Sequence, residues 1–564
     1  MKPVPNSFHL VIGGEAGQGL ITLGELLAKS LVRSGYHLLV TQNYMSRIRG
    51  GHNTFSIRVG VAPVTAPQQP IDVLVALDND TVRLHQDELA QANGVVVGDD
   101  AAAATPGLCV RVPFKKLAAS KYENVAALGV VAALLGLDQS VVSETVAVHF
   151  GRKDAAALKA NHAAVEAASA WAAALAPQLI RKLAPADASV SRLMLNGNEA
   201  LALGALAGGV KFCAFYPMSP ATSLVLNLAK HAEAMGLVVE QAEDEIAAVN
   251  MAIGASFAGS RSMTATSGGG FALMAEGVSL AAMTETPVVI VVAQRPGPAT
   301  GLPTRTEQSD LEFVLHAGHG EFPRALFAPG SIQECFDLMR RAFALAEASQ
   351  GPVFLLTDQF LADSYRDVPA FNLAADPVLA LPAPEPAAVP YQRYALTASG
   401  VSPRRLPGAS QDLVVADSDE HDADGHITED LELRSKMVEK RLRKLKILTD
   451  NVVPPEYDGG DAPDLLLMNW GSTKGAVDEA AARLRAAGRS VGTLHFSQVW
   501  PLLPAQFLAR LQAARRVVGV EGNATGQFSR LIRRESGFTV AGLLTRYDGL
   551  PFTPEYIIEE LGHE

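Results

Sequence analysis

Two short stretches of this chain carry residue types and spacings that could do chemistry. The first is an acidic cluster, Glu243, Asp244 and Glu245, between a short apolar run and a segment of helical period. The second is Ser267 followed by three glycines, 268–270. A carboxyl group at a helix start can move a proton, and a glycine turn lets a ligand approach the backbone. The alternatives are solvated acids that complement a helix dipole and a plain tight turn.

Both stretches lie in a region that alternates strand-like and helix-like segments. Its β-type apolar runs are Leu237–Val239, Ser262–Thr266 and Pro287–Ala293, and the residues between them are rich in Ala, Met and Glu. This alternation predicts parallel strands covered by helices, with ligand sites at the carboxyl ends of the strands. The acidic cluster and the glycine turn each follow such an end.

The motifs around these residues resemble those of thiamine-diphosphate enzymes. Glu245 is followed by IAAVNMAIGASFAG and then by MTATSGGGFALMAEG. The pattern is similar to the alpha subunit of the 2-oxoacid:ferredoxin oxidoreductases. It continues upstream in GNEALALGALAGGVKFCAFYPMSPAT and downstream in TETPVVIVVAQRPGPATGLPTRTEQSDL. Several long motifs in one order are far more specific than a single glycine fingerprint.

The resemblance implies roles at the cofactor. Glu245 matches the glutamate that thiamine enzymes place against N1′ of the aminopyrimidine. Ser219 matches a hydroxyl residue beside the 2-oxo group of the substrate, where the family usually has threonine; Met218 likewise replaces an isoleucine. The other residues expected at the cofactor are Tyr216, Pro217, Ser267, Gly268 and Gly269.

The resemblance also suggests residues for the substrate. An arginine suits bidentate capture of a 2-oxoacid carboxylate. The family match favours Arg305, which follows Thr304 on a loop rich in glycine and proline, and Arg295 is the alternative. His319, in GHGEFPR, contacts substrate or cofactor in one interpretation and is structural in the other.

The N-terminal part of the chain carries a second glycine-rich motif. The run FHLVI leads into GGEAGQGL and a helical stretch to about Arg33, and this resembles a phosphate-cradling turn formed by Gly14, Gly17 and Gly19. With TQNYMSRIRGGHNTFSIRVG, the region resembles the gamma domain of the same family. A weak functional interpretation is that Arg47 and Arg49 contact the phosphates of coenzyme A. The alternative is an interdomain salt-bridge loop.

We expect an α/β protein with three doubly wound or Rossmann-like domains. The predicted parts are a gamma-type domain (1–183), a linker (184–190), a thiamine-diphosphate pyrimidine-binding domain (191–370), an extended strap with a basic helix (371–460) and a transketolase C-terminal-like domain (461–564). The strap contains His421, Asp422, Asp424 and His426, but their spacing fits no strong metal template, so we predict no metal site.

Composition excludes several classes of function. The net charge of −12 argues against a general binder of nucleic acid or anionic membranes. The absence of a transmembrane-length apolar run, and an N-terminus unlike a signal peptide, favour a cytoplasmic protein. Cys109, Cys213 and Cys335 lie far apart in apolar patterns and read as buried thiols, because an iron–sulfur cluster normally needs four thiolates.

The chain lacks two parts that the family's chemistry requires. No GDG motif with a downstream asparagine, the signal of a diphosphate and magnesium domain, is found; Gly98-Asp99-Asp100 has no such partner. We therefore expect thiamine diphosphate to be shared with a separate beta subunit that carries Mg²⁺ and a [4Fe-4S] cluster. The resemblance implies an (alpha-beta)₂ heterotetramer with ferredoxin as its redox partner.

The implied reaction is the oxidative decarboxylation of 2-oxoglutarate to succinyl-CoA and carbon dioxide, with coenzyme A as acyl acceptor and ferredoxin reduced. The fused gamma–alpha order is typical of 2-oxoglutarate enzymes and related 2-oxoacid enzymes. Run in reverse with strongly reduced ferredoxin, as in a reductive TCA cycle, the reaction would fix carbon dioxide. The alternatives are pyruvate or indolepyruvate specificity in the same mechanism, and a non-catalytic scaffold that organises a beta subunit.

Overall fold

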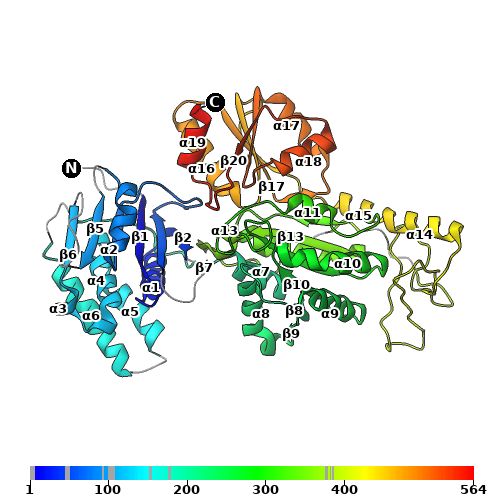
Figure 1. Ribbon diagram of the computed structural model, residues 1–564, viewed down its shortest axis with the longest axis horizontal. Coiled ribbons are helices and arrows are strands. Elements are labelled where there is room, and N and C mark those ends of the chain that lie inside the picture. The colour runs from blue at the N-terminus through cyan, green and yellow to red at the C-terminus, as the bar shows by residue number, and fades with distance from the viewer. Residues whose placement is uncertain are drawn as a thin grey trace. The chain divides into compact units, whose positions relative to one another are not determined.

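The computed structural model describes residues 7–44, 51–91, 94–99, 108–151, 155–175, 179–374, 379–381, 383 and 386–563. The chain divides into two compact units. The first comprises Met1–Asn196, Asp363–Ala370 and Thr553–Tyr556, and the second comprises Gly197–Ala362, Phe371–Phe552 and Ile557–Glu564. Three sheets with their helices make up these units (Figure 1).

The first unit contains an eight-stranded sheet in the order β6-β5-β4-β1-β3-β2-β14-β7. The strands are β1 (Ser7–Glu15), β2 (His37–Asn43), β3 (His52–Gly60), β4 (Val73–Ala76), β5 (Val95–Asp99), β6 (Leu108–Val112), β7 (Leu193–Leu195) and β14 (Tyr365–Val368). The neighbouring strands β1, β4, β5 and β6 pair in parallel, as expected for a doubly wound domain. The other half is antiparallel and was not predicted, because its strands mix polar and apolar residues.

Helices cover this sheet and close its core. They are α1 (Leu20–Arg33), α2 (Asn79–His85), α3 (Phe114–Leu117), α4 (Glu123–Leu135), α5 (Gln139–Phe150) and α6 (Ala155–Ala172). Helix α4 is apolar on nearly all sides, which is typical of a fully buried helix, and it packs beside α1, α5 and α6 in the core.

The second unit is built on a seven-stranded sheet in the order β18-β12-β13-β11-β10-β8-β9. The strands are β8 (Phe212–Phe215), β9 (Val238–Gln241), β10 (Ser262–Thr266), β11 (Val288–Gln294), β12 (Ala325–Phe327), β13 (Pro352–Asp358) and β18 (Gln498–Trp500). All pairings are parallel except that of β18. The three runs predicted as strands correspond to β9, β10 and β11, which confirms the predicted alternation.

Its helices are α7 (Gly197–Ala207), α8 (Thr222–Met235), α9 (Glu245–Phe257), α10 (Gly268–Met283), α11 (Leu311–His316), α12 (Ile332–Ser349) and α13 (Gln359–Asp363). α9 packs on α10, while α7 packs on α8 and α12. Both α10 and α12 also contact β11 and β13, so the sheet lies between helices (Figure 1). That layering buries parallel strands on both faces.

A third sheet, in the order β15-β17-β16-β19-β20, completes the second unit. Its strands are β15 (Glu456–Asp458), β16 (Leu465–Trp470), β17 (Val491–Phe496), β19 (Arg516–Glu521) and β20 (Gly542–Thr545), with α16 (Lys474–Ala486), α17 (Leu508–Ala513), α18 (Gln527–Ser536) and α19 (Pro554–His563). Its apolar side chains join those of α9, α10 and β11 in one continuous core, and β18 extends the middle sheet.

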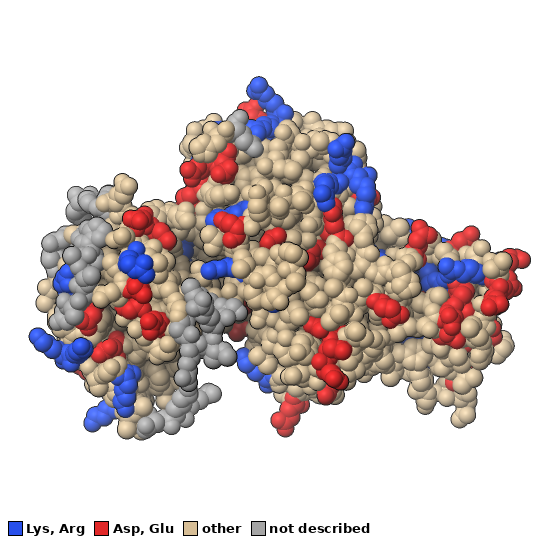
Figure 2. Space-filling view, viewed as in Figure 1, with Lys and Arg blue, Asp and Glu red and all other residues tan. Residues whose placement is uncertain are grey.

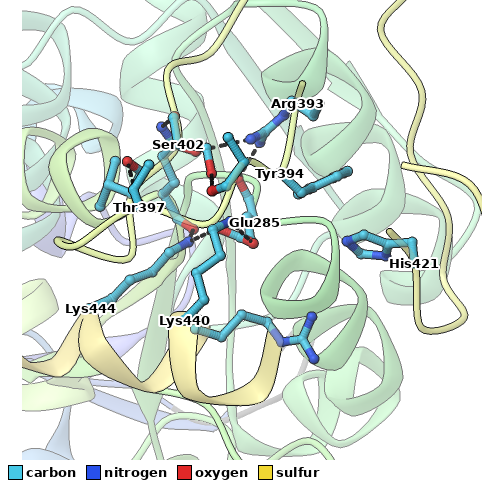
Figure 3. A network of polar contacts seen from close by, with 12 residues as sticks. Glu285, Arg393, Tyr394, Thr397, Ser402, His421, Lys440 and Lys444 are labelled. Carbon is cyan, nitrogen blue, oxygen red and sulfur yellow. Dashed lines mark hydrogen bonds and ion pairs between the residues drawn. The ribbon is translucent and has the colours of Figure 1, made fainter. Parts of the chain in front are cut away.

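A buried charge cluster attaches the strap to the middle sheet (Figure 3). Glu285 lies between α10 and β11 and is fully buried. Its two carboxylate oxygens lie 2.6 Å from Lys440 Nζ and 2.5 Å from Lys444 Nζ, at the end of α14 (Leu431–Arg443) and the start of α15 (Leu445–Asp450). From the strap, Arg393 Nη2 donates to Glu285 O at 2.8 Å, and Tyr394 Oη donates to Thr284 O at 3.2 Å.

Burial alone would raise the pKa of Glu285, but Lys444, Lys440 and Arg393 outweigh it and hold that pKa well below its usual range. Glu285 is therefore ionised at neutral pH.

Other basic groups of α14 have acidic partners as well: the buried Arg441 and the exposed Arg434 pair with Glu420, and the exposed Lys436 pairs with Glu432. On the surface over α14, basic and acidic side chains lie together (Figure 2). These basic groups of the helix are therefore engaged in ion pairs within the chain.

We expect Glu285→Gln to release the strap and α14 from α10. The change leaves two buried ammonium groups without their carboxylate, which costs about 3–5 kcal/mol in comparable sites. Hydrogen exchange of the α14 amides should accelerate by at least a hundredfold, and the thermal midpoint should fall.

The matched control is the triple variant Glu285→Met, Lys440→Met, Lys444→Met, which removes all three charges together. It should recover most of the lost stability, since no unpaired charge stays buried. Unchanged exchange in Glu285→Gln would contradict the bracing role.

Candidate active site

Glu245 is the buried acid of the predicted cluster. It opens α9 with 3% of its surface exposed, whereas Glu243 is exposed. Asp244 is the N-cap, and its carboxylate accepts a hydrogen bond from Ala247 N at 2.7 Å. Glu245 Oε1 is buried and has no hydrogen-bond partner among the described residues. The helix start is therefore satisfied by Asp244, and the carboxyl group of Glu245 is left for another partner.

The glycine turn at the start of α10 lies between two carboxyl groups. A Cβ on Gly270 would lie 2.9 Å from Glu245 Cδ, and one on Gly268 would lie 2.5 Å from Asp310 Oδ1. At Gly269, which is exposed, the nearest atom to such a Cβ would be Ala299 O at 3.7 Å. The outer glycines thus make room for the acids, and the middle one is exposed with space for a side chain-sized group.

Ser267, just before this turn, is fully buried at the N-cap of α10. Its hydroxyl neither caps the helix nor has another partner among the described residues. Two unpaired buried oxygens, Ser267 Oγ and Glu245 Oε1, beside an exposed glycine fit a ligand that brings its own polar atoms. The aminopyrimidine of thiamine diphosphate is such a ligand.

The segment after β8 lies beside the same turn. Tyr216, Pro217 and Ser219 are exposed, and Met218 Sδ lies 4.0 Å from Thr266 Oγ1 at the end of β10. The carbonyl of Ser219 accepts a hydrogen bond from Arg295 Nη1 at 2.7 Å. Arg295, the alternative of the two candidate arginines, therefore bonds directly to the predicted substrate segment.

Arg305 lies on the loop that follows Arg295, next to the half-buried Thr304. Its side-chain stem packs against Gly549, where a Cβ would lie 3.0 Å from Arg305 Cβ. The loop is held to the third sheet by Gln308, whose Nε2 donates to Trp470 O at 3.1 Å and whose Oε1 accepts from Gly522 N at 2.9 Å. The third sheet therefore fixes the path of the loop that carries Arg305.

His319 is exposed on a turn clasped to α10. Its backbone N donates to Ser279 Oγ at 2.8 Å, and that hydroxyl donates to His319 O at 3.2 Å. The backbone of this turn therefore has a structural role, and the imidazole of His319 is exposed.

The glycine motif of the first unit follows β1. Gly17 and Gly19 have positive φ angles of 99° and 77°. A Cβ on Gly19 would lie 2.9 Å from Asn124 Cγ, and one on Gly14 would lie 2.5 Å from Gln18 Oε1, whereas Gly17 has open space around it. Two of the three glycines are required for packing, and Gly17 alone faces open space. The predicted Arg47 and Arg49 lie outside the described residues.

The remaining predicted features are structural in the described part of the chain. Cys213 and Cys335 are buried, Cys109 is half-buried, and burial raises the pKa of Cys213 to about 12. Asp422 Oδ1 accepts from Asp424 N, Gly425 N and His426 N, so this acid closes a turn. No described group of three or more His, Cys, Asp or Glu residues could hold a metal ion, and no described helix is long and apolar enough to cross a membrane.

Sequence reasoning missed Asp310 and Gln308. Both lie in the family-like TRTEQSDL segment, but nothing in their residue types distinguishes a ligand-facing side chain from a helix cap or a surface polar residue. The only signal in the sequence was the long polar run itself, and the structure shows most of its residues half-buried.

Family models match two parts of the chain. Residues 203–440 match the thiamine-diphosphate-binding domain of pyruvate flavodoxin/ferredoxin oxidoreductases, and residues 9–171 match a pyruvate ferredoxin/flavodoxin oxidoreductase domain.

Relatives match nearly the full length. The 2-oxoacid:ferredoxin oxidoreductase subunit alpha of a Sulfolobus species is 32% identical, with 98% of this chain and 96% of that protein covered. The 2-oxoglutarate oxidoreductase subunit KorA of Mycobacterium tuberculosis is 28% identical, with 96% and 89% covered.

A solved structure has the same fold over its whole length. It is the 2-oxoglutarate:ferredoxin oxidoreductase of Magnetococcus marinus with 2-oxoglutarate, coenzyme A and succinyl-CoA bound, and it matches with a TM-score of 0.93, 30% identity and 99% of each chain covered. Together with the predicted α/β layering, these matches show that this chain belongs to the alpha subunits of the thiamine-diphosphate-dependent 2-oxoacid:ferredoxin oxidoreductases.

Proposed function

We propose that this chain is the alpha subunit of an enzyme that converts 2-oxoglutarate, coenzyme A and oxidised ferredoxin to succinyl-CoA, carbon dioxide and reduced ferredoxin, reversibly. The observation that carries the proposal is the buried, unpartnered Glu245 Oε1 behind the exposed glycine turn. A buried carboxyl oxygen with no partner is costly, and a bound ligand that completes it would remove this cost.

Glu245, Ser267 and the 268–270 turn would hold the pyrimidine end of thiamine diphosphate, with Tyr216 and Pro217 beside it. When bound, this cofactor supplies a nucleophilic carbon and an electron sink for decarboxylation. Glu245 would hold a proton at N1′ of the ring, and its burial keeps bulk water from competing for that proton. The exposure of Gly269 leaves this side of the turn accessible to a partner that would cover the rest of the cofactor.

Arg295 is the best-supported ligand for the substrate's 1-carboxylate, because it is fixed to Ser219 O. Ser219 would present its hydroxyl to the 2-oxo oxygen. Arg305 and Thr304, further along the same loop, would then bind the distal carboxylate, with His319 at the rim. Two arginines on one loop suit a dicarboxylate. The relatives named for 2-oxoglutarate, including the Magnetococcus marinus enzyme, support the same substrate.

The remaining components are supplied outside this site. We propose that a beta subunit provides the diphosphate and Mg²⁺ site and the [4Fe-4S] cluster in an (alpha-beta)₂ heterotetramer, with ferredoxin as acceptor. The Gly14–Gly19 turn, with Arg47 and Arg49, is proposed to bind coenzyme A. Pyruvate specificity is the second candidate, because the family-model descriptions name pyruvate enzymes. The costly burial of Glu245 disfavours a scaffold role, because a scaffold does not need an unpartnered carboxyl group.

The direct experiment is methyl viologen reduction by this chain co-expressed with a candidate beta subunit, with 2-oxoglutarate and pyruvate run in parallel. Coenzyme A-dependent activity with 2-oxoglutarate, in the pair alone, supports the proposal. Activity with pyruvate alone would keep the reaction class and replace the substrate, and full activity of this chain by itself would contradict the shared site.

Glu245→Gln should lower 2-oxoacid-dependent viologen reduction by the complex at least about a hundredfold, since a neutral amide cannot hold the N1′ proton as a carboxyl group does. The control is Glu243→Gln, which removes an exposed acid two residues away and should leave turnover within about twofold. Near-normal turnover of Glu245→Gln would refute the assignment.

Arg305→Ala should raise KM for 2-oxoglutarate by about tenfold to a hundredfold and leave KM for pyruvate nearly unchanged, since it removes a charged hydrogen bond to the distal carboxylate. Arg295→Ala should impair both substrates, because both carry the 1-carboxylate. If Arg305→Ala raises KM equally for both substrates, Arg305 and not Arg295 binds the 1-carboxylate.

A further inference from the structure

Asp310 is a second carboxyl group at the glycine turn. It occupies the N-cap position of α11, yet its side chain makes no capping hydrogen bond to that helix. By contrast, Asp244, Ser331 and Asp430 all cap the helices that follow them. The carboxyl group of Asp310 instead lies over Gly268, and its buried Oδ2 has no hydrogen-bond partner among the described residues.

The backbone around Asp310 holds this orientation. Asp310 N donates to Gln294 Oε1 at 3.0 Å, and Gln294 is the buried last residue of β11, directly before Arg295. Asp310 and Arg295 are therefore anchored to the same strand end and interact electrostatically. Arg295 donates a hydrogen bond to Ser219 O at 2.7 Å, and its positive charge also acts on the carboxyl group of Asp310.

We propose that Asp310 is a positioning residue of the 2-oxoacid site, whose charge state determines how much of the positive charge of Arg295 is available to the substrate's carboxylate. The inference rests on the proposed function, because it assigns the substrate to the space beside Arg295 and Gly269. An ionised Asp310 offsets part of the positive charge of Arg295 and repels an incoming anion. A protonated Asp310 leaves Arg295 to the substrate.

The charged surroundings let Asp310 change its protonation in the physiological range. Burial and, to a lesser extent, repulsion from Glu307 raise the pKa of Asp310, Arg295 opposes them, and the net pKa is about 6. The Ser267–Gly270 turn of α10 contributes no ionisable side chain, and Glu245 lies behind its far end at Gly270.

The other neighbouring element is α11, whose ionisable groups face α18. Glu312 pairs with Arg530, and His316 lies 3.1 Å from Arg534 Nη1. These groups engage one another at the surface, so Glu307 and Arg295 remain the main influences on Asp310.

The sign of the pH effect follows from these charges. Below about pH 6 the carboxyl group is neutral and Arg295 attracts the substrate fully. As pH rises through the pKa, the new negative charge weakens that attraction. KM for the 2-oxoacid should therefore rise with pH, by about tenfold between pH 5.5 and 8, while kcat changes little from this cause.

The test is the pH profile of KM and kcat for the complex with its beta subunit, using methyl viologen. Asp310→Asn keeps the shape and removes the charge, so its KM should be low and independent of pH. Glu307→Gln should shift the inflection of KM to lower pH, because it removes a repulsion that raises the pKa of Asp310. Glu312→Gln removes an equal charge two residues away and should leave the profile as in the wild type.

The role of Asp310 and the proposed 2-oxoacid activity fail in different ways. Wild-type pH dependence of KM in Asp310→Asn, or the same shift in Glu312→Gln as in Glu307→Gln, would overturn the role of Asp310 alone. A wild-type complex that turns over no 2-oxoacid would remove the proposed function and this inference with it.

Discussion

The burial of one carboxyl group, that of Glu245, is the constraint on which the rest of the second unit depends. A carboxyl group that loses its water costs several kcal/mol unless a partner replaces it. Here the first turn of α9 does not supply that partner, because Asp244 already caps the helix. The neighbouring residues are consistent with this need: Gly270 makes room for the acid, Ser267 leaves its own hydroxyl unpaired, and Gly269 opens toward a ligand.

Such a site is useful only if its parts are held still, since catalytic groups must keep their geometry to a fraction of an ångström. Three attachments restrain the elements that carry it. Glu285 fastens the strap and α14 to the end of α10. Gln308 pins the arginine-bearing loop to the third sheet, and β18 extends the middle sheet from the other side. The C-terminal part of the chain therefore contributes to the site, because it sets the path of the loop between Arg295 and Asp310.

Much of this could be predicted from the sequence because strand periodicity and strand-end motifs are local signals. The runs before Glu245 and Ser267 are short, apolar and bounded by turn residues, and they became β9 and β10 within one or two residues. Other features depend on contacts distant in sequence. β14 joins the first sheet from residue 365, Glu285 meets lysines some 155 residues away, and the orientation of Asp310 depends on Gln294. An aspartate before a helix predicts a cap, and only the tertiary packing turns its side chain toward Gly268.

The central claim is that this chain holds one part of a thiamine diphosphate site and a beta subunit holds the other. It is tested most directly by calorimetric titration of thiamine diphosphate, in the presence of Mg²⁺, into this chain alone, the beta subunit alone and the complex. The account predicts saturable binding by the complex, no tight binding by either chain alone, and weaker binding by a complex that carries Glu245→Gln. Tight binding by this chain alone, or wild-type affinity in the Glu245→Gln complex, would contradict a cofactor shared between subunits and completed by Glu245.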